Sequence, residues 1–195
     1  MSHDRDGGPN KPRPPALLIL GFGLFLVVIG YLVTASLVRR KVVTFTPRPP
    51  HAGGLAARPG VDTATIDTTD PERWRYLDLD RGRLLSPPDT SGWDVALRRY
   101  QIVSAGANAD AGPLAFDDAD PSAGPIAPPA GIETIHYPLG RWYRYSMFSH
   151  LLEPNEHLYL IRTDEGRVVK LEVLSYYCPG LTAGCLTFRY GGAGT

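Results

Sequence analysis

The chain has 195 residues, with 20 basic and 20 acidic side chains. Because these charges balance, no global field would attract the protein to nucleic acid, and we expect no nucleic-acid partner. The sequence also lacks the G-x-S-x-G, P-loop and strand-associated G-x-G-x-x-G patterns of common enzyme families. We therefore expect a non-catalytic protein, with no catalytic residue and no metal site.

The first predicted element is a membrane-spanning helix over residues 16–38, preceded by a polar tail over residues 1–15. This helix carries no charge and would reach roughly 35 Å, whereas the hydrocarbon core of a bilayer is about 30 Å thick. A cleaved signal peptide would have a shorter apolar run and small residues at the cut. Here the run ends in basic residues, so we predict a retained anchor. The residues expected at the membrane interface are Arg39, Arg40 and Lys41.

Small side chains fall near one line of this predicted helix. They are Gly23, Gly30 and Thr34, which are seven and four residues apart. Small residues on one line allow a second helix to approach closely. Glycines are also common in membrane helices without a partner. We predict that this face packs against a transmembrane helix of another subunit, in addition to contacting membrane lipid.

Residues 39–60 are rich in proline and glycine and have no apolar periodicity, which predicts a linker. We expect the globular domain to occupy residues 61–195. Residues 108–131 within it are rich in Ala, Asp, Pro and Gly and are expected to form a long exposed loop.

The remaining segments of the domain have the pattern of antiparallel strands. RWRYLDL and RLL form one expected hairpin, on which Asp78 and Asp80 are read as solvated. GWDVALRRYQIVSA is expected to be one long strand. HLYLIR and RVVKLEVLSYY form a second hairpin, and CLTFRY is the last strand. We predict a mainly β domain, an antiparallel sandwich or an open barrel-like sheet, behind a single transmembrane helix.

One strand of the second hairpin predicts a sheet with one wet face. Val169, Leu171 and Val173 alternate with Lys170 and Glu172. Because successive side chains of a strand point to opposite faces, the apolar set should face the core and the charged pair should face water.

The only two cysteines, Cys178 and Cys185, flank the short loop PGLTAG between two expected strands. Opposed residues on paired strands lie near disulfide distance, which favours a disulfide. Two reduced cysteines packed as small apolar residues are an alternative. A zinc site would need a second ligand pair, and covalent haem attachment would need C-x-x-C-H. A disulfide implies an oxidising compartment, and hence a domain outside the cytoplasm.

The basic residues on either side of the predicted transmembrane helix give only a weak indication of its orientation in the membrane. They nearly balance and lean slightly toward a cytoplasmic C-terminus. The expected disulfide favours the opposite orientation, which we adopt: a bacterial inner-membrane protein with a cytoplasmic N-terminus and a periplasmic C-terminal domain. The basic residues counted are Arg5, Lys11 and Arg13 before the helix, and Arg39, Arg40, Lys41 and Arg48 after it.

The order of several phrases resembles the HmuY family of bacterial haem-binding proteins. These phrases are ATIDTTDPERWRYLDLDRGRLL, GWDVALRRYQI, GRWYRYSM, LYLIRTDEGRVVKLEVLSYY and CLTFRY, and together they cover most of residues 64–190. The resemblance implies a mainly β fold and an extracytoplasmic location, in agreement with the strand pattern and the cysteines.

The resemblance also implies candidate haem ligands, since haem-binding members hold the iron with two axial side chains. The family's histidine after the Trp-x-x-aromatic-Ser phrase corresponds to Met147 here, and methionine is a known haem ligand. His150 lies three residues further on. The second ligand of the family comes from a long middle segment, which is shortened here and offers only His136.

Two functions follow as hypotheses. The first is a non-catalytic accessory subunit, with no cofactor, whose β domain covers the extracytoplasmic face of a larger membrane complex of the photosynthetic or respiratory kind. The second is a membrane-tethered haem or tetrapyrrole binder that uses Met147 or His150 with His136.

Overall fold

The computed structural model describes residues 15–37, 42–57, 60–86, 91–118 and 138–193 and divides the chain into two units, Met1–Arg40 and Lys41–Thr195. In the first unit, α1 (Ala16–Leu37) is long and apolar enough to cross a membrane by length and composition. Its described side chains are largely exposed, as expected of an apolar helix whose surroundings are lipid or other helices. The basic residues predicted at the interface lie outside the described residues.

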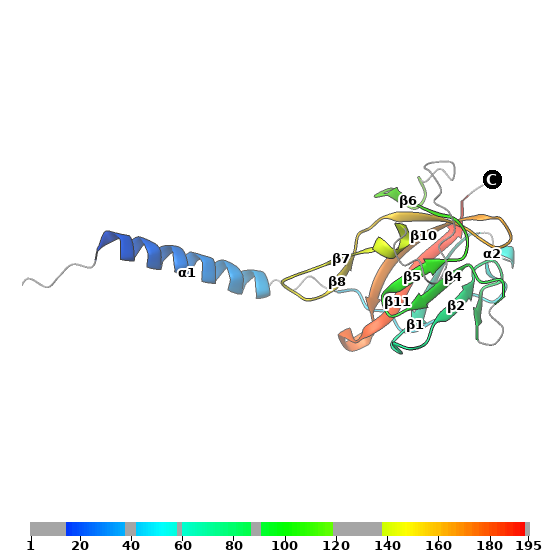
Figure 1. Cartoon of the computed structure of the whole chain (residues 1–195), viewed down its shortest axis with the longest axis horizontal. Helices are drawn as coiled ribbons and strands as arrows, with labels where there is room; N and C mark the ends of the chain where they lie inside the picture. Colours follow the sequence, from blue (N-terminus) through cyan, green and yellow to red (C-terminus); the bar gives the residue numbers. More distant parts are fainter. Residues whose placement is uncertain (1–14, 38–41, 58–59, 87–90, 119–137, 194–195) are drawn as a thin grey trace, which may run out of the picture. The chain divides into compact units, whose positions relative to one another are not determined.

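The second unit is built on a five-stranded antiparallel sheet, which confirms the predicted mainly β class (Figure 1). The long strands β10 and β11 pair with each other near its centre, and the hairpin predicted from HLYLIR and RVVKLEVLSYY is formed by β9 and β10. In sheet order the strands are β1 (Val61–Asp67), β11 (Ala183–Gly192), β10 (Val168–Tyr177), β9 (Leu158–Arg162) and β6 (Asn108–Gly112).

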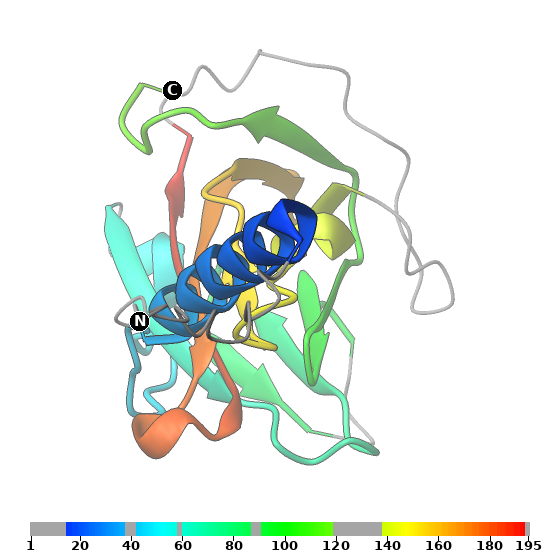
Figure 2. The ribbon, with the colours of Figure 1, turned by 90° about the vertical axis from the view of Figure 1, so that its left-hand side faces the viewer.

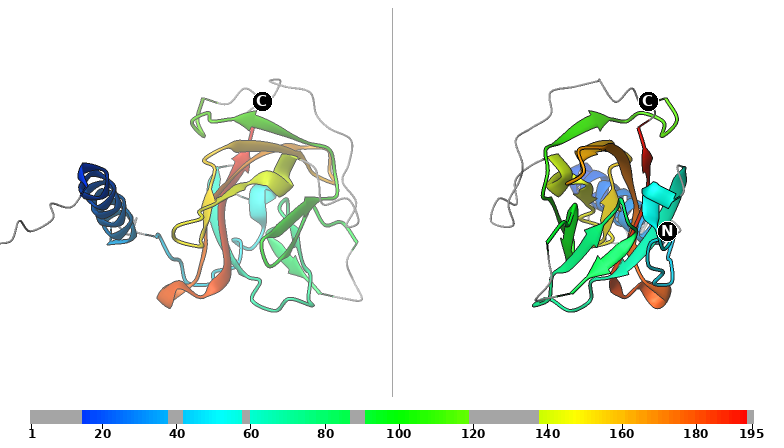
Figure 3. Two further views of the ribbon diagram at one scale, coloured as in Figure 1. Left: turned by 60° about the vertical axis from the view of Figure 1, so that its left-hand side comes forward. Right: turned by 90° about the vertical axis from the view of Figure 1, so that its right-hand side faces the viewer.

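A four-stranded antiparallel sheet and a two-stranded hairpin complete the described part of the domain. In both views of Figure 3 the green strands of the four-stranded sheet lie toward the end of the domain opposite β6. The described sheets stay open rather than closing into a barrel. The strands are β3 (Arg83–Leu85), β2 (Arg75–Asp78), β4 (Val95–Arg98) and β5 (Gln101–Ser104) in the sheet, and β7 (Tyr143–Tyr145) and β8 (Leu152–Pro154) in the hairpin.

The single long strand expected between residues 92 and 105 is instead a tight hairpin, so this expectation is wrong. Arg98 pairs with Gln101, and the two residues between them form the turn. Arg99 has a φ of 52°, a conformation that is uncommon outside glycine and asparagine. No glycine or proline marked this turn in the sequence, which is why the strand pattern appeared continuous.

The predicted wet face of β10 is partly covered. Lys170 is buried, its Nζ donates a hydrogen bond to the carbonyl oxygen of Phe116 at 2.7 Å, and it lies over the Phe116 ring. Glu172 is half-buried and accepts a hydrogen bond from Arg189, its cross-strand partner, at 2.5 Å. The segment after β6 thus shields a face that alternation alone assigned to water.

Two segments expected to be irregular take part in the domain. Residues 42–57, within the predicted linker, pack on the β unit: Arg48 exchanges two backbone hydrogen bonds of 2.8 Å with Thr65. The short helix α2 (Gly54–Ala57) buries Leu55. In the predicted loop 108–131, the first five residues form β6. Residues 42–57 were predicted to be a linker because of their closely spaced prolines. Strand β6 was predicted to be loop because it contains no large apolar residue.

The predicted disulfide is confirmed. Cys178 and Cys185 are bonded, with their Cα atoms 4.8 Å apart. They bracket the turn η2 (Pro179–Leu181), which joins β10 to β11 at the lower end of the domain in Figure 2. Because Cys185 lies within β11 and is fully buried, the cross-link attaches the turn to the central sheet.

Candidate functional site on the β7–β8 hairpin

The candidate ligand residues of the sequence lie on the turn of the β7–β8 hairpin. In Figure 1 this hairpin projects beyond the sheets. Tyr143 pairs with Pro154 and Tyr145 with Leu152. The turn between them is closed by a backbone hydrogen bond of 2.9 Å from the N–H of Ser146 to the oxygen of Leu151. Residues 146–151 are therefore held as a defined turn.

The base of the hairpin is fixed to the core. Trp142, immediately before β7, is fully buried and follows the turn η1 (Pro138–Arg141). Its indole N–H donates a hydrogen bond of 2.7 Å to the oxygen of Tyr100 in the β4–β5 turn. On the other strand, the N–H of Leu152 donates to the hydroxyl of Tyr177 at 2.8 Å. The hairpin thus presents its tip from a rigid support.

The tip exposes large apolar side chains. The exposed fraction is 72% for Met147, 66% for Phe148 and 50% for Tyr145. Single exposed apolar residues are ordinary, but three within four positions on a projecting turn form a patch of the kind that marks an interaction site.

His150 has two unusual features at this tip. Its φ is 55°, and left-handed backbone at a residue other than glycine is uncommon and often found at functional sites. Its Nδ1 lies 2.6 Å from the Tyr145 hydroxyl oxygen, so the two side chains share a hydrogen bond. The imidazole is exposed, and its other nitrogen is thereby presented to solvent or to a ligand.

The structure therefore brings two of the three predicted haem-ligand residues, Met147 and His150, onto one turn, whereas His136 lies outside the described residues.

On α1, the Thr34 hydroxyl donates to the Gly30 oxygen at 2.8 Å, and a Cβ at Gly23 or Gly30 would meet no described atom within 4 Å. The partner helix expected there stays a prediction.

A second polar site was missed because Asp78 and Asp80 were expected to be solvated. Both are fully buried, so that expectation is wrong. Asp78 accepts hydrogen bonds from Arg81 at 3.1 Å and Arg83 at 2.8 Å, and Asp80 accepts one from Arg167 at 2.7 Å. The β2–β3 turn contacts residues that are remote in sequence: the N–H groups of Gly53, Leu55 and Ala56 donate to the backbone oxygens of Arg81, Leu79 and Asp80, and Arg167 binds the Asp80 carboxylate. The local sequence does not reveal these contacts.

Asp94 joins the β2–β3 turn to the turn after β9. Its side chain is fully buried and accepts hydrogen bonds from the backbone N–H groups of Leu79 at 2.7 Å and Asp164 at 2.8 Å. Burial raises the pKa of the Asp94 carboxyl to about 7; the two N–H donors oppose this rise, and the neighbouring Asp80 and Asp164 carboxylates add to it. The Trp-Asp phrase of the sequence contained this residue without indicating its role.

Asp78 has the opposite electrostatic balance. Burial alone would raise the pKa of its carboxyl, but hydrogen bonds from Arg83 and Arg81 outweigh burial and hold that pKa below its usual value. The carboxylate is therefore ionised at neutral pH and stabilises the turn after β2.

Solved structures with the same fold are found among bacterial proteins, although no protein-family model and no curated protein matches the sequence. A protein described as HmuY-like and heme-binding, from Bacteroides vulgatus, superposes with a TM-score of 0.53 at 19% identity, over 67% of this chain and 90% of that one. A protein described as a lipoprotein, from Bacteroides fragilis, gives 0.51 at 20% identity over 67% and 88%.

The apo form of an HmuY analog from Tannerella forsythia gives a TM-score of 0.54 at 16% identity, over 67% of this chain and 94% of the analog. At identities this low the likeness shows the fold alone. It agrees with the mainly β architecture described above. The β domain of this chain therefore has the HmuY-like fold, and it follows an N-terminal helix apolar enough to be a membrane anchor.

Proposed function

We propose that this protein is a non-catalytic, membrane-anchored accessory subunit that docks on the extracytoplasmic surface of a larger membrane complex through the tip of the β7–β8 hairpin. The observation that carries the proposal is the exposed apolar tip formed by Tyr145, Met147 and Phe148 on a rigid base. Aromatic and methionine side chains are enriched in the centres of protein interfaces, and a preorganised surface loses little entropy on binding.

The place where the chain enters the β domain supports this role. The oxygen of Val43 accepts a hydrogen bond of 2.5 Å from the Ser175 hydroxyl, close to the end of β10. Tyr177, two residues further along β10, holds the hairpin strand β8 through its hydroxyl and the Leu152 N–H. The entry segment and the hairpin base are therefore attached to the same end of one strand.

A membrane partner is favoured by the short connection to the anchor. Helix α1 ends at Leu37, and residues 38–41 separate it from the described residue Val42. Five residue steps reach at most about 18 Å. A domain on so short a connection stays close to the membrane that holds the anchor, where other membrane proteins are available as partners.

Replacement of the tip side chains tests this role. After gentle detergent extraction from native membranes, the wild type should migrate within a large assembly in native electrophoresis or sedimentation. The Met147→Ser/Phe148→Ser variant should migrate separately from that assembly. Val61→Ser/Leu84→Ser is the matched control, because it also removes two exposed apolar side chains, from β1 and β3. The proposal is wrong if the wild type migrates as a lone monomer, or if the tip variant stays assembled like the control.

Haem binding at the same tip is a second candidate. Tyrosine, methionine and histidine are all known haem ligands, and Tyr145, Met147 and His150 lie at the exposed end of one hairpin, where Tyr145 contacts His150. The group itself would supply the redox or carrier chemistry when bound. The chain's own contribution would be the shared hydrogen bond of 2.6 Å, which orients the imidazole and tunes the phenol.

Haemin titration of the full chain in detergent tests this candidate. A sharp Soret band should appear and should be lost in Met147→Ala or His150→Ala. His157→Ala is the control, since His157 is bound to Asp110 at 2.9 Å and lies outside the hairpin turn. An unchanged spectrum in the wild type would contradict haem binding while leaving the docking proposal to its own test.

A periplasmic β domain is part of the proposal and has its own measurement. In intact cells, Cys178 and Cys185 should resist alkylation until a reductant is added, because both sulfurs are in the disulfide. Free thiols that react only with membrane-permeant reagents would place the domain in the cytoplasm instead.

A further inference from the structure

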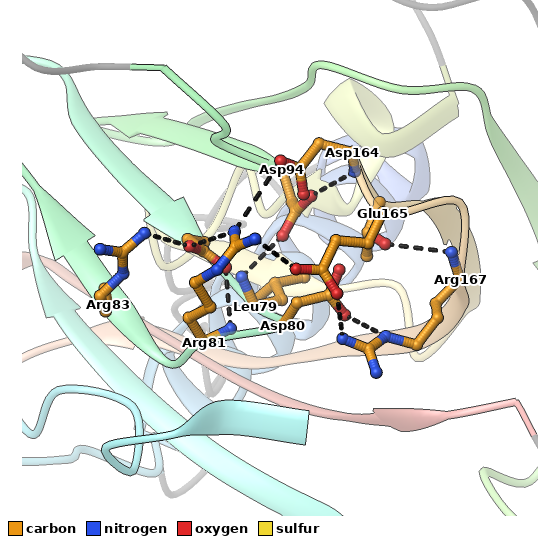
Figure 4. Close-up of polar contacts among 10 residues, drawn as sticks. Leu79, Asp80, Arg81, Arg83, Asp94, Asp164, Glu165 and Arg167 are labelled. Carbon is orange, nitrogen blue, oxygen red and sulfur yellow. Dashed lines mark hydrogen bonds and ion pairs between the residues drawn. The ribbon is translucent and has the colours of Figure 1, made fainter. Parts of the chain in front are cut away.

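We propose that Asp80, Asp94 and Asp164 form a binding site for a divalent cation of the Ca²⁺ type. The site lies where the β2–β3 turn meets the turn between β9 and β10, and its side chains converge in Figure 4. It is separate from the hairpin tip and does not depend on the docking role proposed for it.

The spacing of the carboxylates suits a cation with oxygen ligands. One oxygen from each of the three side chains lies within 4.8 Å of the others. Ca²⁺ binds oxygen at roughly 2.3–2.6 Å, so two ligands on opposite sides of the ion are about 5 Å apart. A single ion placed among the three oxygens can therefore contact all of them without a large rearrangement.

Asp80 supplies an independent observation that points to a ligand. Its side chain is fully buried, and its Oδ1 accepts the hydrogen bond from Arg167. Its Oδ2 is also buried but has no hydrogen-bond partner among the described residues. An orphaned carboxylate oxygen is costly, and nearly all buried polar atoms in proteins have a partner. A cation in the cluster would supply that partner.

The charges around the cluster leave room for two positive charges. The carboxylates and guanidinium groups joined in this network comprise five acidic and three basic side chains, so two negative charges stay uncompensated when all five carboxylates are ionised. Buried charges are normally paired or bound to metal. The acidic residues are Asp78, Asp80, Asp94, Asp164 and Glu165, and the basic residues are Arg81, Arg83 and Arg167.

The cluster also has lone pairs and solvent access for a cation. Each oxygen of Asp94 accepts one backbone hydrogen bond, which leaves a further lone pair on each. Asp164 is exposed, so it can admit an ion and the water ligands that complete its shell. Three carboxylates plus water match the flexible six- to eight-fold oxygen coordination of Ca²⁺ better than the strict octahedron of Mg²⁺.

Calcium titration of the EDTA-stripped full chain in detergent tests the site. Isothermal titration with CaCl₂ should show one saturable site, and MgCl₂ should bind more weakly. At a free Ca²⁺ concentration of about 100 times Kd, the Tm of the β domain should rise by about 5–10 °C. Asp80→Asn and Asp164→Asn should abolish both effects, whereas Asp118→Asn, which alters an exposed carboxylate outside the cluster, should preserve them.

Asp164→Asn decides the outcome if Asp80→Asn does not fold, because its side chain is exposed and its backbone N–H still binds Asp94. Absence of Ca²⁺ binding in the wild type would overturn the proposal. Binding that Asp164→Asn leaves unchanged would place the ion elsewhere and would also overturn it.

Discussion

Replacing Cys178 and Cys185 by alanine removes the cross-link that closes the β10–β11 turn. The bonded residues are seven apart in sequence, and for a loop this short the chain-entropy model gives about 2–3 kcal/mol of lost stability. Cys185 is fully buried in β11, and loss of its sulfur adds about 1 kcal/mol for the small cavity. We therefore expect the free energy of unfolding to fall by about 3–4 kcal/mol.

Urea unfolding of the full chain in detergent, followed by tryptophan fluorescence, measures this loss of free energy. In a thermal unfolding scan, Tm should fall by about 6–16 °C. The Cys178→Ala variant is the informative control, because one substitution already breaks the bond. Its stability should match that of the double variant to within about 1 kcal/mol, which is the cavity contribution of Cys185.

Two results would refute this reasoning. If each single substitution cost about half of the double substitution, side-chain packing and not the cross-link would be responsible. If the double variant were as stable as the wild type, the turn would be ordered without the bond. In that case the order would come from the backbone hydrogen bond of 2.8 Å from the N–H of Cys178 to the oxygen of Thr182, which spans the turn.

Three further substitutions test the packing. Asp78→Asn should destabilise the domain near pH 7, and in acid-unfolding curves the difference from wild type should shrink as the pH falls below about 4. The reason is that the pKa of Asp78 is lower in the folded than in the unfolded state, so its stabilisation is present above the unfolded pKa and is lost as the pH falls through the folded pKa. Trp142→Phe should cost about 2–4 kcal/mol in urea unfolding, because it removes buried volume and the hydrogen bond to Tyr100; a loss below 1 kcal/mol would contradict the role given to Trp142. Gly184→Ala should lower Tm by about 5 °C or more, since the residue has a φ of 120° and an added Cβ would lie 2.8 Å from the Cα of Thr69; an unchanged Tm would show that this segment relaxes.

Local pattern predicted the parts of this protein whose burial follows from their own side chains. The uncharged run that became α1 and the hairpin of β9 and β10 needed no tertiary information, and the cysteines were paired correctly because their loop is short. The turn at Arg99 and the strand β6 were missed because their sequences carry none of the usual turn or strand residues.

The two candidate sites were predictable to different degrees. Met147 and His150 were proposed as ligands from the resemblance to the HmuY family, and because they are close in sequence the structure places them on one turn. The acidic cluster was not identified, because Asp80 and Asp164 are far apart in the chain and look like ordinary solvated turn residues.

The sequence by itself therefore determined that an apolar helix precedes a pleated, disulfide-bonded domain, since hydrophobic length, period and cysteine spacing are local properties of the chain. Only the tertiary structure decided which charges are buried. Arg167 binds the buried Asp80, and Phe116 covers the buried Lys170. In both cases the charge and its cover are remote in sequence, so no short window of residues contains them both.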